Sequence, residues 1–95
     1  MRFEYDPHKS SSNADKHGID FEEAQELWDD EGRLAARIQR KGEERCLLIA
    51  RHAGSLWTAI YVHRDDAIRI ISVRRSTDGE VSYYDRCRND YAQRP

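Results

Sequence analysis

The stretch "RCLLIARHAGSLWTAIYVHRDDAIRIISVRR", residues 45–75, decides the fold because it contains three strand-like segments separated by two short turns. Branched and aromatic residues predominate in the segments, and glycine or paired aspartates interrupt them. The expected strands cover residues 45–52, 56–63 and 67–75. In the last strand, Ile70-Ile71 places apolar groups on both faces, which predicts a central, well-covered strand.

The same pattern continues on both sides of this stretch. Residues 33–40 read as a further strand, and residues 80–91 read as a helix that follows Thr77-Asp78-Gly79. The alternation in Arg2-Phe3-Glu4-Tyr5 predicts a short edge strand. The expected turns are Lys41-Gly42-Glu43, Ala53-Gly54-Ser55 and Arg64-Asp65-Asp66.

Two helices are expected before the strands. Asp6-Pro7 is a typical helix start, and Gly18 is placed to end a polar helix over residues 7–17. Asp20 starts the second helix, with Glu23 three residues later. Its apolar stripe consists of Phe21, Ala24, Leu27 and Trp28. The predicted fold class is α+β, with a four-stranded antiparallel sheet packed by these two N-terminal helices and one C-terminal helix.

Length and composition indicate one small domain over residues 1–95. No apolar run approaches the roughly 18 residues that a membrane span requires, so we expect no membrane partner. Cys46 and Cys87 lie far apart without a CxxC motif, which favours reduced thiols in an intracellular protein and argues against a structural metal.

The net charge of −2 conceals an uneven distribution. Residues 1–32 carry three basic and ten acidic side chains, a balance of −7, whereas residues 33–95 carry thirteen basic and eight acidic, a balance of +5. Twelve of those thirteen are arginine, which suits bidentate phosphate contacts. The distribution is consistent with a basic face for RNA and an acidic face for a basic partner, or with a solvated surface of paired charges.

Arginines of the last strand are the first candidates for a site. Strand alternation places Ser72 and Arg74 on one face, with Arg69 and Arg75 on the other. An arginine near the middle of a sheet requires a carboxylate, solvent or a bound phosphate. The structural alternative for each is an ion pair with an N-terminal carboxylate.

Three histidines, His17, His52 and His63, are candidates for proton transfer near neutral pH. None belongs to an HExxH, GxSxG or P-loop motif, and a lone histidine is more often a surface or capping residue. Tyr84 lies four residues after Glu80 and shares its helix face, an arrangement that also suits core packing.

In their order along the chain, these residues resemble the BrnT family of toxins. The residues that carry the resemblance are Asp6-Pro7, Lys9, Asn13, Lys16-His17-Gly18, Phe21-Glu22-Glu23-Ala24, Gly42-Glu43-Glu44-Arg45, Arg64, Arg69-Ile70-Ile71-Ser72, Arg74-Arg75, Glu80 and Tyr84.

The resemblance implies a RelE-like fold and a cytoplasmic, metal-independent ribonuclease that inhibits translation and needs no cofactor. It also implies a BrnA-like antitoxin in a 2:2 complex, with operator DNA bound only through the antitoxin. Two alternatives stay open: a non-catalytic RNA- or protein-binding module, and a degenerate toxin that serves only as the antitoxin's partner. The low net charge counts against a free ribonuclease.

RNA cleavage by its own 2′-hydroxyl needs a base, positive groups that stabilise the charged transition state, and an acid. We expect His17 to act as acid or base and Lys16 to contact phosphate, with Arg64 and Arg74 stabilising transition-state charge. Positions of a second rank, with RNA-positioning or structural roles, are Arg45, Arg75 and Tyr84. No metal ligands are expected.

Overall fold

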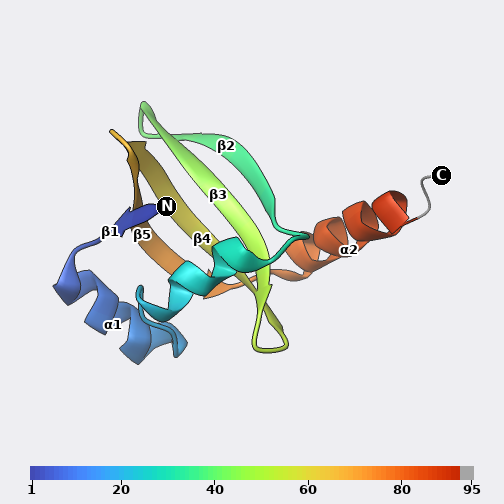
Figure 1. Cartoon of the computed structure of the whole chain (residues 1–95), viewed down its shortest axis with the longest axis horizontal. Helices are drawn as coiled ribbons and strands as arrows, with labels where there is room; N and C mark the ends of the chain where they lie inside the picture. The colour runs from blue at the N-terminus through green and yellow to red at the C-terminus, as the bar shows by residue number, and fades with distance from the viewer. Residues whose placement is uncertain (93–95) are drawn as a thin grey trace.

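The computed structural model describes residues 1–92, which form one mixed sheet and three helices (Figure 1). The strands are β1 (Arg2–Glu4), β2 (Leu34–Arg40), β3 (Glu43–His52), β4 (Ser55–Arg64) and β5 (Ala67–Arg75). The helices are α1 (Pro7–His17), the 3₁₀ helix η1 (Glu23–Asp29) and α2 (Asp78–Ala92). No helix in this part of the chain is long and apolar enough to cross a membrane.

The sheet has five strands in the order β1-β5-β4-β3-β2, so the predicted four-stranded antiparallel sheet is incomplete. Strands β2 to β5 form the expected antiparallel meander, but β1 pairs in parallel with β5. This pairing joins segments more than sixty positions apart, so no local pattern announces it. The middle strand is β4, and β5 pairs on its outer side with the three residues of β1.

Tight turns connect the meander at the predicted positions. Lys41-Gly42 and Ala53-Gly54 each have two successive residues with positive φ, the pattern of a type I′ two-residue hairpin loop. Asp65 has a φ of 56° in the third turn. These turns align apolar residues of neighbouring strands on common faces.

A β-bulge in β5 corrects two predictions about that strand. Ile60 pairs with Ser72, yet the next residue, Tyr61, pairs with Ile70, so Ile71 is an extra residue. The isoleucine pair therefore marks a bulge and not a central strand. The bulge also shifts the alternation: Arg69 lies opposite Val62, on the same face as Ser72 and Arg74, and not with Arg75 as predicted.

One face of the sheet, the covered face, is buried under η1 and the loop that follows α1. The predicted stripe is confirmed, because Phe21, Ala24, Leu27 and Trp28 are all buried in one cluster. Edge-to-face aromatic contacts continue it across the sheet, from Phe3 to Trp28 and from Trp28 to Tyr61. The second helix begins at Glu23 rather than Asp20, but the predicted pairing of Asp20 with Glu23 is confirmed in part, because the Asp20 carboxylate accepts a hydrogen bond from the Glu23 amide at 2.8 Å.

The opposite face, the open face, is covered at one end only, by the start of α2. Val81 and Tyr84 pack there against Ile49 and Leu56, while the rest of α2 extends beyond the sheet (Figure 1). The helix begins two residues earlier than predicted because Thr77 caps it. The Thr77 hydroxyl accepts from the Glu80 amide, and the Glu80 carboxylate accepts from the Thr77 amide.

Candidate functional site

Register places arginines from three strands on the uncovered part of the open face. Arg69 of β5 lies opposite Val62 of β4, and Arg64 lies two residues beyond Val62 on the same face. Arg45 of β3 lies opposite Ile38 of β2, close to the Cys46–Tyr61 pair that ends the β3–β4 ladder. We call Arg45, Arg64 and Arg69 the arginine cluster.

A carboxylate lies beside each arginine of the cluster, and that of Glu43 accepts a hydrogen bond from Arg45. Glu4 Oε1 lies 3.8 Å from both Arg64 Nε and Arg69 Nη1, and Glu43 Oε2 lies 3.2 Å from Arg45 Nη2. The Arg64 side chain is 63% exposed, and the other two are about one-third exposed. Arg45 Nε is buried and has no hydrogen-bond partner among the described residues. These guanidiniums therefore keep donors available for a phosphate.

Arg74 shares the open face but is held more tightly. Its two terminal nitrogens donate to the two oxygens of Glu80 at 2.8 and 3.0 Å, and Thr58 donates to the same carboxylate. The hydrogen bond from Arg74 is the main cause that lowers the pKa of the Glu80 carboxyl to about 2, and the same bond raises the Arg74 pKa. This pair fastens the start of α2 to the sheet, consistent with the structural alternative for Arg74.

Lys16 and His17 form a separate group, which we call the α1 corner, in the last turn of α1, where both are exposed. One turn earlier, the Asn13 carboxamide donates to the Val73 carbonyl at 2.8 Å and accepts from the Val73 amide. Val73 lies six residues along β5 from Ala67, the partner of Arg64, which corresponds to about 20 Å of strand. His17 and Arg64 therefore do not converge on one phosphate.

The other predicted positions are divided between surface and interior. Arg75 points to the covered face, where its guanidinium lies 5.1 Å from the centre of the Trp57 ring, and its side chain is exposed. Tyr84 is fully buried, and its hydroxyl donates to Asp30 at 2.7 Å. Burial, followed by the hydrogen bond to Asp30, raises the pKa of Tyr84. This position favours the structural role that the sequence left open for Tyr84.

Neither remaining histidine lies in the arginine cluster. His52 Nε2 lies 2.8 Å from Glu23 Oε2, so that it ties β3 to η1. His63 stacks edge-on against Tyr61 on the covered face of β4, at the end of the strand. Both positions agree with the structural interpretation of a lone histidine.

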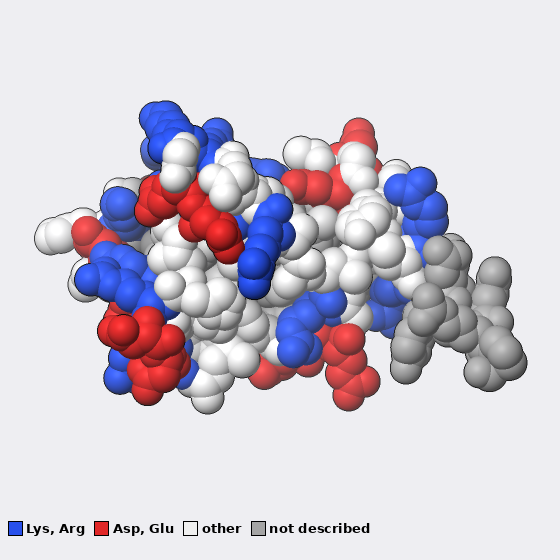
Figure 2. Space-filling model, turned by 90° about the horizontal axis from the view of Figure 1, so that it is seen from above, with Lys and Arg blue, Asp and Glu red and all other residues white. Residues whose placement is uncertain are grey.

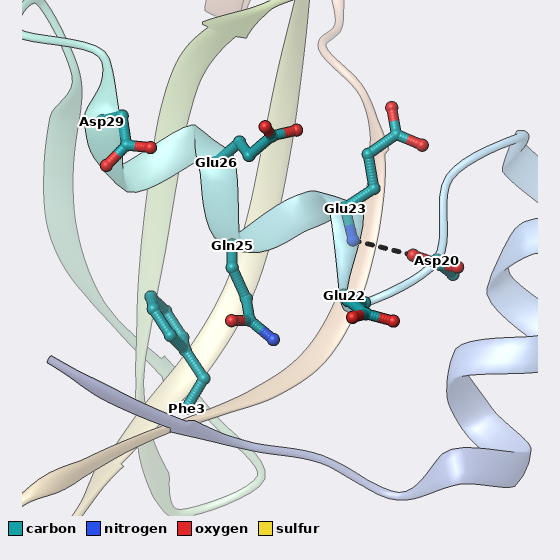
Figure 3. Close-up of a pocket in the computed structure, with 7 residues that line it drawn as sticks. All are labelled: Phe3, Asp20, Glu22, Glu23, Gln25, Glu26 and Asp29. Atoms are coloured by element: carbon teal, nitrogen blue, oxygen red, sulfur yellow. Dashed lines mark hydrogen bonds between the residues drawn. The ribbon is translucent and has the colours of Figure 1, made fainter.

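A shallow acidic pocket lies along η1 and the residues before it (Figure 3). It is lined by Phe3, Asp20, Glu22, Glu23, Gln25, Glu26 and Asp29. The carboxylates fan outward from η1 instead of converging on one point (Figure 3). Among the described residues, no group of three or more His, Cys, Asp or Glu side chains is arranged to hold a metal ion.

The surface seen from above carries both signs of charge side by side (Figure 2). Blue and red groups surround an uncharged central area, so this view shows no broad region of one sign (Figure 2). Ion pairs such as Arg2–Asp66 and Glu4–Arg69 join the two halves of the sequence. The uneven charge distribution along the chain is thus largely evened out in space on this side.

Comparison with known families identifies the chain. The sequence model of a family described as "Ribonuclease toxin, BrnT, of type II toxin-antitoxin system" matches residues 5–80. The matched range contains α1, η1, β2 to β5 and the first turn of α2, which is most of the chain. The chain belongs to the BrnT family. A search of curated proteins found no match.

For this BrnT family member, the sequence analysis named Arg69 as a candidate but did not group it with Arg45 and Arg64. Arg69 was placed on the wrong face because alternation was continued through the bulge at Ile71. The signal was present, since two adjacent isoleucines in an otherwise alternating strand are consistent with a bulge as well as with a covered strand. Glu4 was also missed, because β1 reaches Arg69 only through its long-range parallel pairing.

Proposed function

We propose that this BrnT family member is the RelE-like, cytoplasmic toxin of a toxin–antitoxin pair and cleaves RNA without a metal ion. Its partner in this proposal is a BrnA-type antitoxin in a 2:2 complex, through which alone the pair binds operator DNA. Family membership supports a ribonuclease toxin with an antitoxin. The finer points, including the RNA-cleavage mechanism, rest on the chemistry of the residues.

The arginine cluster is the observation that carries the proposal. Three guanidiniums on neighbouring strands lie on a part of the sheet that no helix covers, and their carboxylate partners sit at 3.2 to 3.8 Å. Exposed pairs of this kind contribute little to stability, about 0–1 kcal/mol each. Phosphates of an RNA strand replace such partners readily, since arginine binds phosphate in a bidentate manner.

The distances support different roles for the two groups of candidates. Because about 20 Å of strand separates Arg64 from the α1 corner, a single-stranded RNA of a few nucleotides that follows β5 would contact both. We assign Arg64, with Arg45 and Arg69, to holding the RNA strand. Proton transfer stays with His17, and phosphate contact at the α1 corner stays with Lys16. Arg74 and Arg75, near the same end of β5, supply positive charge there.

The reaction at the α1 corner is an internal transesterification. The 2′-hydroxyl gives its proton to the base as its oxygen attacks the adjacent phosphorus. The bond from phosphorus to the 5′-oxygen breaks, and that oxygen takes a proton from an acid, which leaves a 2′,3′-cyclic phosphate and a 5′-hydroxyl. His17 is the histidine at this corner, and an imidazole can accept or donate a proton, which suits it for either transfer.

Separate alanine variants test these roles on a short synthetic RNA. We expect His17→Ala to lower kcat by about 10²–10³. We expect Arg64→Ala mainly to raise KM, because it removes uniform binding of the strand. His8→Ala, on the same helix, and Arg86→Ala, on α2, are matched controls. Wild-type cleavage and growth arrest by His17→Ala, Arg64→Ala and Arg74→Ala alike would contradict the proposed site.

The toxin role has its own test. Inducible expression of the chain should arrest growth, and co-expression of a BrnA-type protein encoded in the adjacent reading frame should restore it. Absence of arrest, with RNA binding intact, would support the non-catalytic alternative.

A further inference from the structure

The two edges of the sheet differ in how their backbone groups are satisfied. At the β5 side, β1 covers residues 67–69, and the Asn13 carboxamide takes up both the N–H and the C=O of Val73. At the other side, β2 presents a seven-residue edge that no strand of the described chain pairs with. Native proteins usually shield edges of this length.

The hairpin geometry defines which groups of β2 point outward. Arg40 and Glu43 close a type I′ two-residue loop and so form a hydrogen-bonded pair. Because hydrogen bonding alternates along an antiparallel ladder, Ala36 and Ile38 bond inward to β3. The N–H and C=O groups of Ala35, Arg37 and Gln39 therefore face away from the sheet.

Charge determines what kind of strand fits this edge. Residues 33–41, RLAARIQRK, carry four cations and no carboxylate. If two β2 strands met symmetrically about Arg37, the middle residue of the strand, the two copies of Arg37 would lie opposite each other, which is destabilising. An acidic extended segment of another protein would pair favourably instead. A strand supplies alternating N–H and C=O groups that match the edge, whereas the phosphates of RNA supply only acceptors.

We propose that the outer edge of β2 is the docking site for an acidic, extended segment of the antitoxin, which adds a sixth strand to the sheet. This inference rests on the proposed function for the existence of that partner. In the added strand, the side chains next to Ala36 and Ile38 lie on the open face and are apolar. The side chains next to Arg37 and Arg40 are carboxylates. Since Ile38 lies beside Arg45, chain that continues from the added strand reaches the arginine cluster and blocks RNA there.

Amide hydrogen exchange on the whole chain tests the docking directly. The probe is the complex with the BrnA-type protein from the adjacent reading frame. We expect the outward amides of Ala35, Arg37 and Gln39 to exchange at least about tenfold more slowly in the complex than in the free protein. The inward amides of Ala36 and Ile38 are the internal control, because β3 protects them in both states.

Two neighbouring alanines provide matched variants. Ala35→Pro removes an outward N–H, so we expect normal folding and a loss of antitoxin affinity of about tenfold or more. Ala35→Val keeps that N–H and should bind like wild type. Ala36→Pro removes an inward N–H and should lower the midpoint of thermal unfolding. That result would confirm which residues of β2 point outward and which point inward.

Several outcomes would overturn the proposal. The first is a complex in which the outward β2 amides stay unprotected, and the second is a folded Ala35→Pro protein that binds with wild-type affinity. The third is protection of these amides by RNA alone. The fourth is protection in the free chain that rises with its concentration, which would indicate a second copy. Failure to form any complex overturns it together with the proposed antitoxin pairing. A free chain that cleaves no RNA, together with protected amides in the complex, supports the docking and counts only against the proposed activity.

Discussion

The two faces of the sheet use similar strands for opposite purposes. The covered face buries aromatic and aliphatic side chains under η1, with rings in edge-to-face contact at about 5 Å. The open face leaves arginines in partial contact with solvent beside carboxylates at 3.2 to 3.8 Å. Burial stabilises the first face, and incomplete pairing keeps the second available for a ligand.

Polar groups follow the same division. On the side of α1, Ser10 and Asn13 are buried, and each makes short hydrogen bonds to backbone that would otherwise be unsatisfied. On the open face, Arg64 is exposed, and Glu4, which is about one-third exposed, lies 3.8 Å from it. Substitutions on the first side should therefore change stability, whereas substitutions in the arginine cluster should change RNA binding and leave stability nearly unchanged.

The largest effect is expected from Phe21→Ala on the covered face. Phe21 is 1% exposed and packs edge-to-face against Tyr5, so truncation leaves a cavity between α1 and the sheet. We expect a loss of about 3–5 kcal/mol in the free energy of unfolding, measured by urea denaturation. Tyr83→Ala, at a side chain 48% exposed, is the control and should cost far less. Equal losses would contradict the assigned core.

Asn13→Ala should have the next largest effect. The carboxamide bonds to the carbonyls of Ile19 and Val73 and to the Val73 amide, and all three groups lose a partner in the variant. A loss of about 2–3 kcal/mol in unfolding free energy is expected, because buried unpaired groups pay their desolvation cost. Ser12→Ala, one residue earlier and exposed, should be neutral. A neutral Asn13→Ala would mean that water replaces the carboxamide.

The meander was predictable because its signals are local. Alternating apolar residues and the turns at Lys41-Gly42 and Ala53-Gly54 are read from a few neighbouring positions, and the structure confirms them. The parallel pairing of β1 with β5 depends on the whole chain between them, so it was missed. The apolar stripe of η1 was predicted correctly, but its 3₁₀ geometry was not. Over only seven residues, the three-residue repeat of a 3₁₀ helix and the 3.6-residue repeat of an α-helix give nearly the same pattern of apolar positions.

The candidate site was predicted as a set of residue types and less well as an arrangement. Arg45, Arg64 and Arg74 do share one face of the sheet. Arg45 and Arg64 lie far from the α1 corner, because sequence order does not tell how far along β5 each residue comes to lie, whereas Arg74 follows Val73 at the α1 end of the strand. Tyr84 was ambiguous for a different reason, because an aromatic residue with a hydroxyl suits RNA contact and a buried hydrogen bond equally well.

Glu80→Gln should weaken the joint between the sheet and α2. The pKa of Glu80 is lowered to about 2 from 4.5, chiefly by Arg74, so the charged carboxylate stabilises the fold above about pH 4.5. That stability disappears as pH falls from about 4.5 to about 2, when the carboxylate takes up a proton. We expect the variant to lose on the order of 2 kcal/mol near neutral pH and to lose less than wild type on acidification.

Urea denaturation of wild type and Glu80→Gln, near neutral pH and in acid, measures both quantities. Glu22→Gln, at an exposed position of the acidic pocket, is the control. If the unfolding free energies of wild type and Glu80→Gln fell by the same amount between neutral pH and acid, the Arg74–Glu80 pair would not contribute to the pH dependence.

The smallest effect, and the sharpest test of the open face, is expected from Glu4→Gln. This change removes the negative charge that lies 3.8 Å from both Arg64 and Arg69 but keeps the size of the side chain. Unfolding free energy should change by less than about 0.5 kcal/mol, because the pairs are exposed. Affinity for a short RNA should rise by about threefold at low salt and by less at high salt, since an RNA phosphate no longer competes with the carboxylate. Weaker binding by Glu4→Gln would mean that Glu4 positions the arginines for RNA instead of occupying their phosphate site.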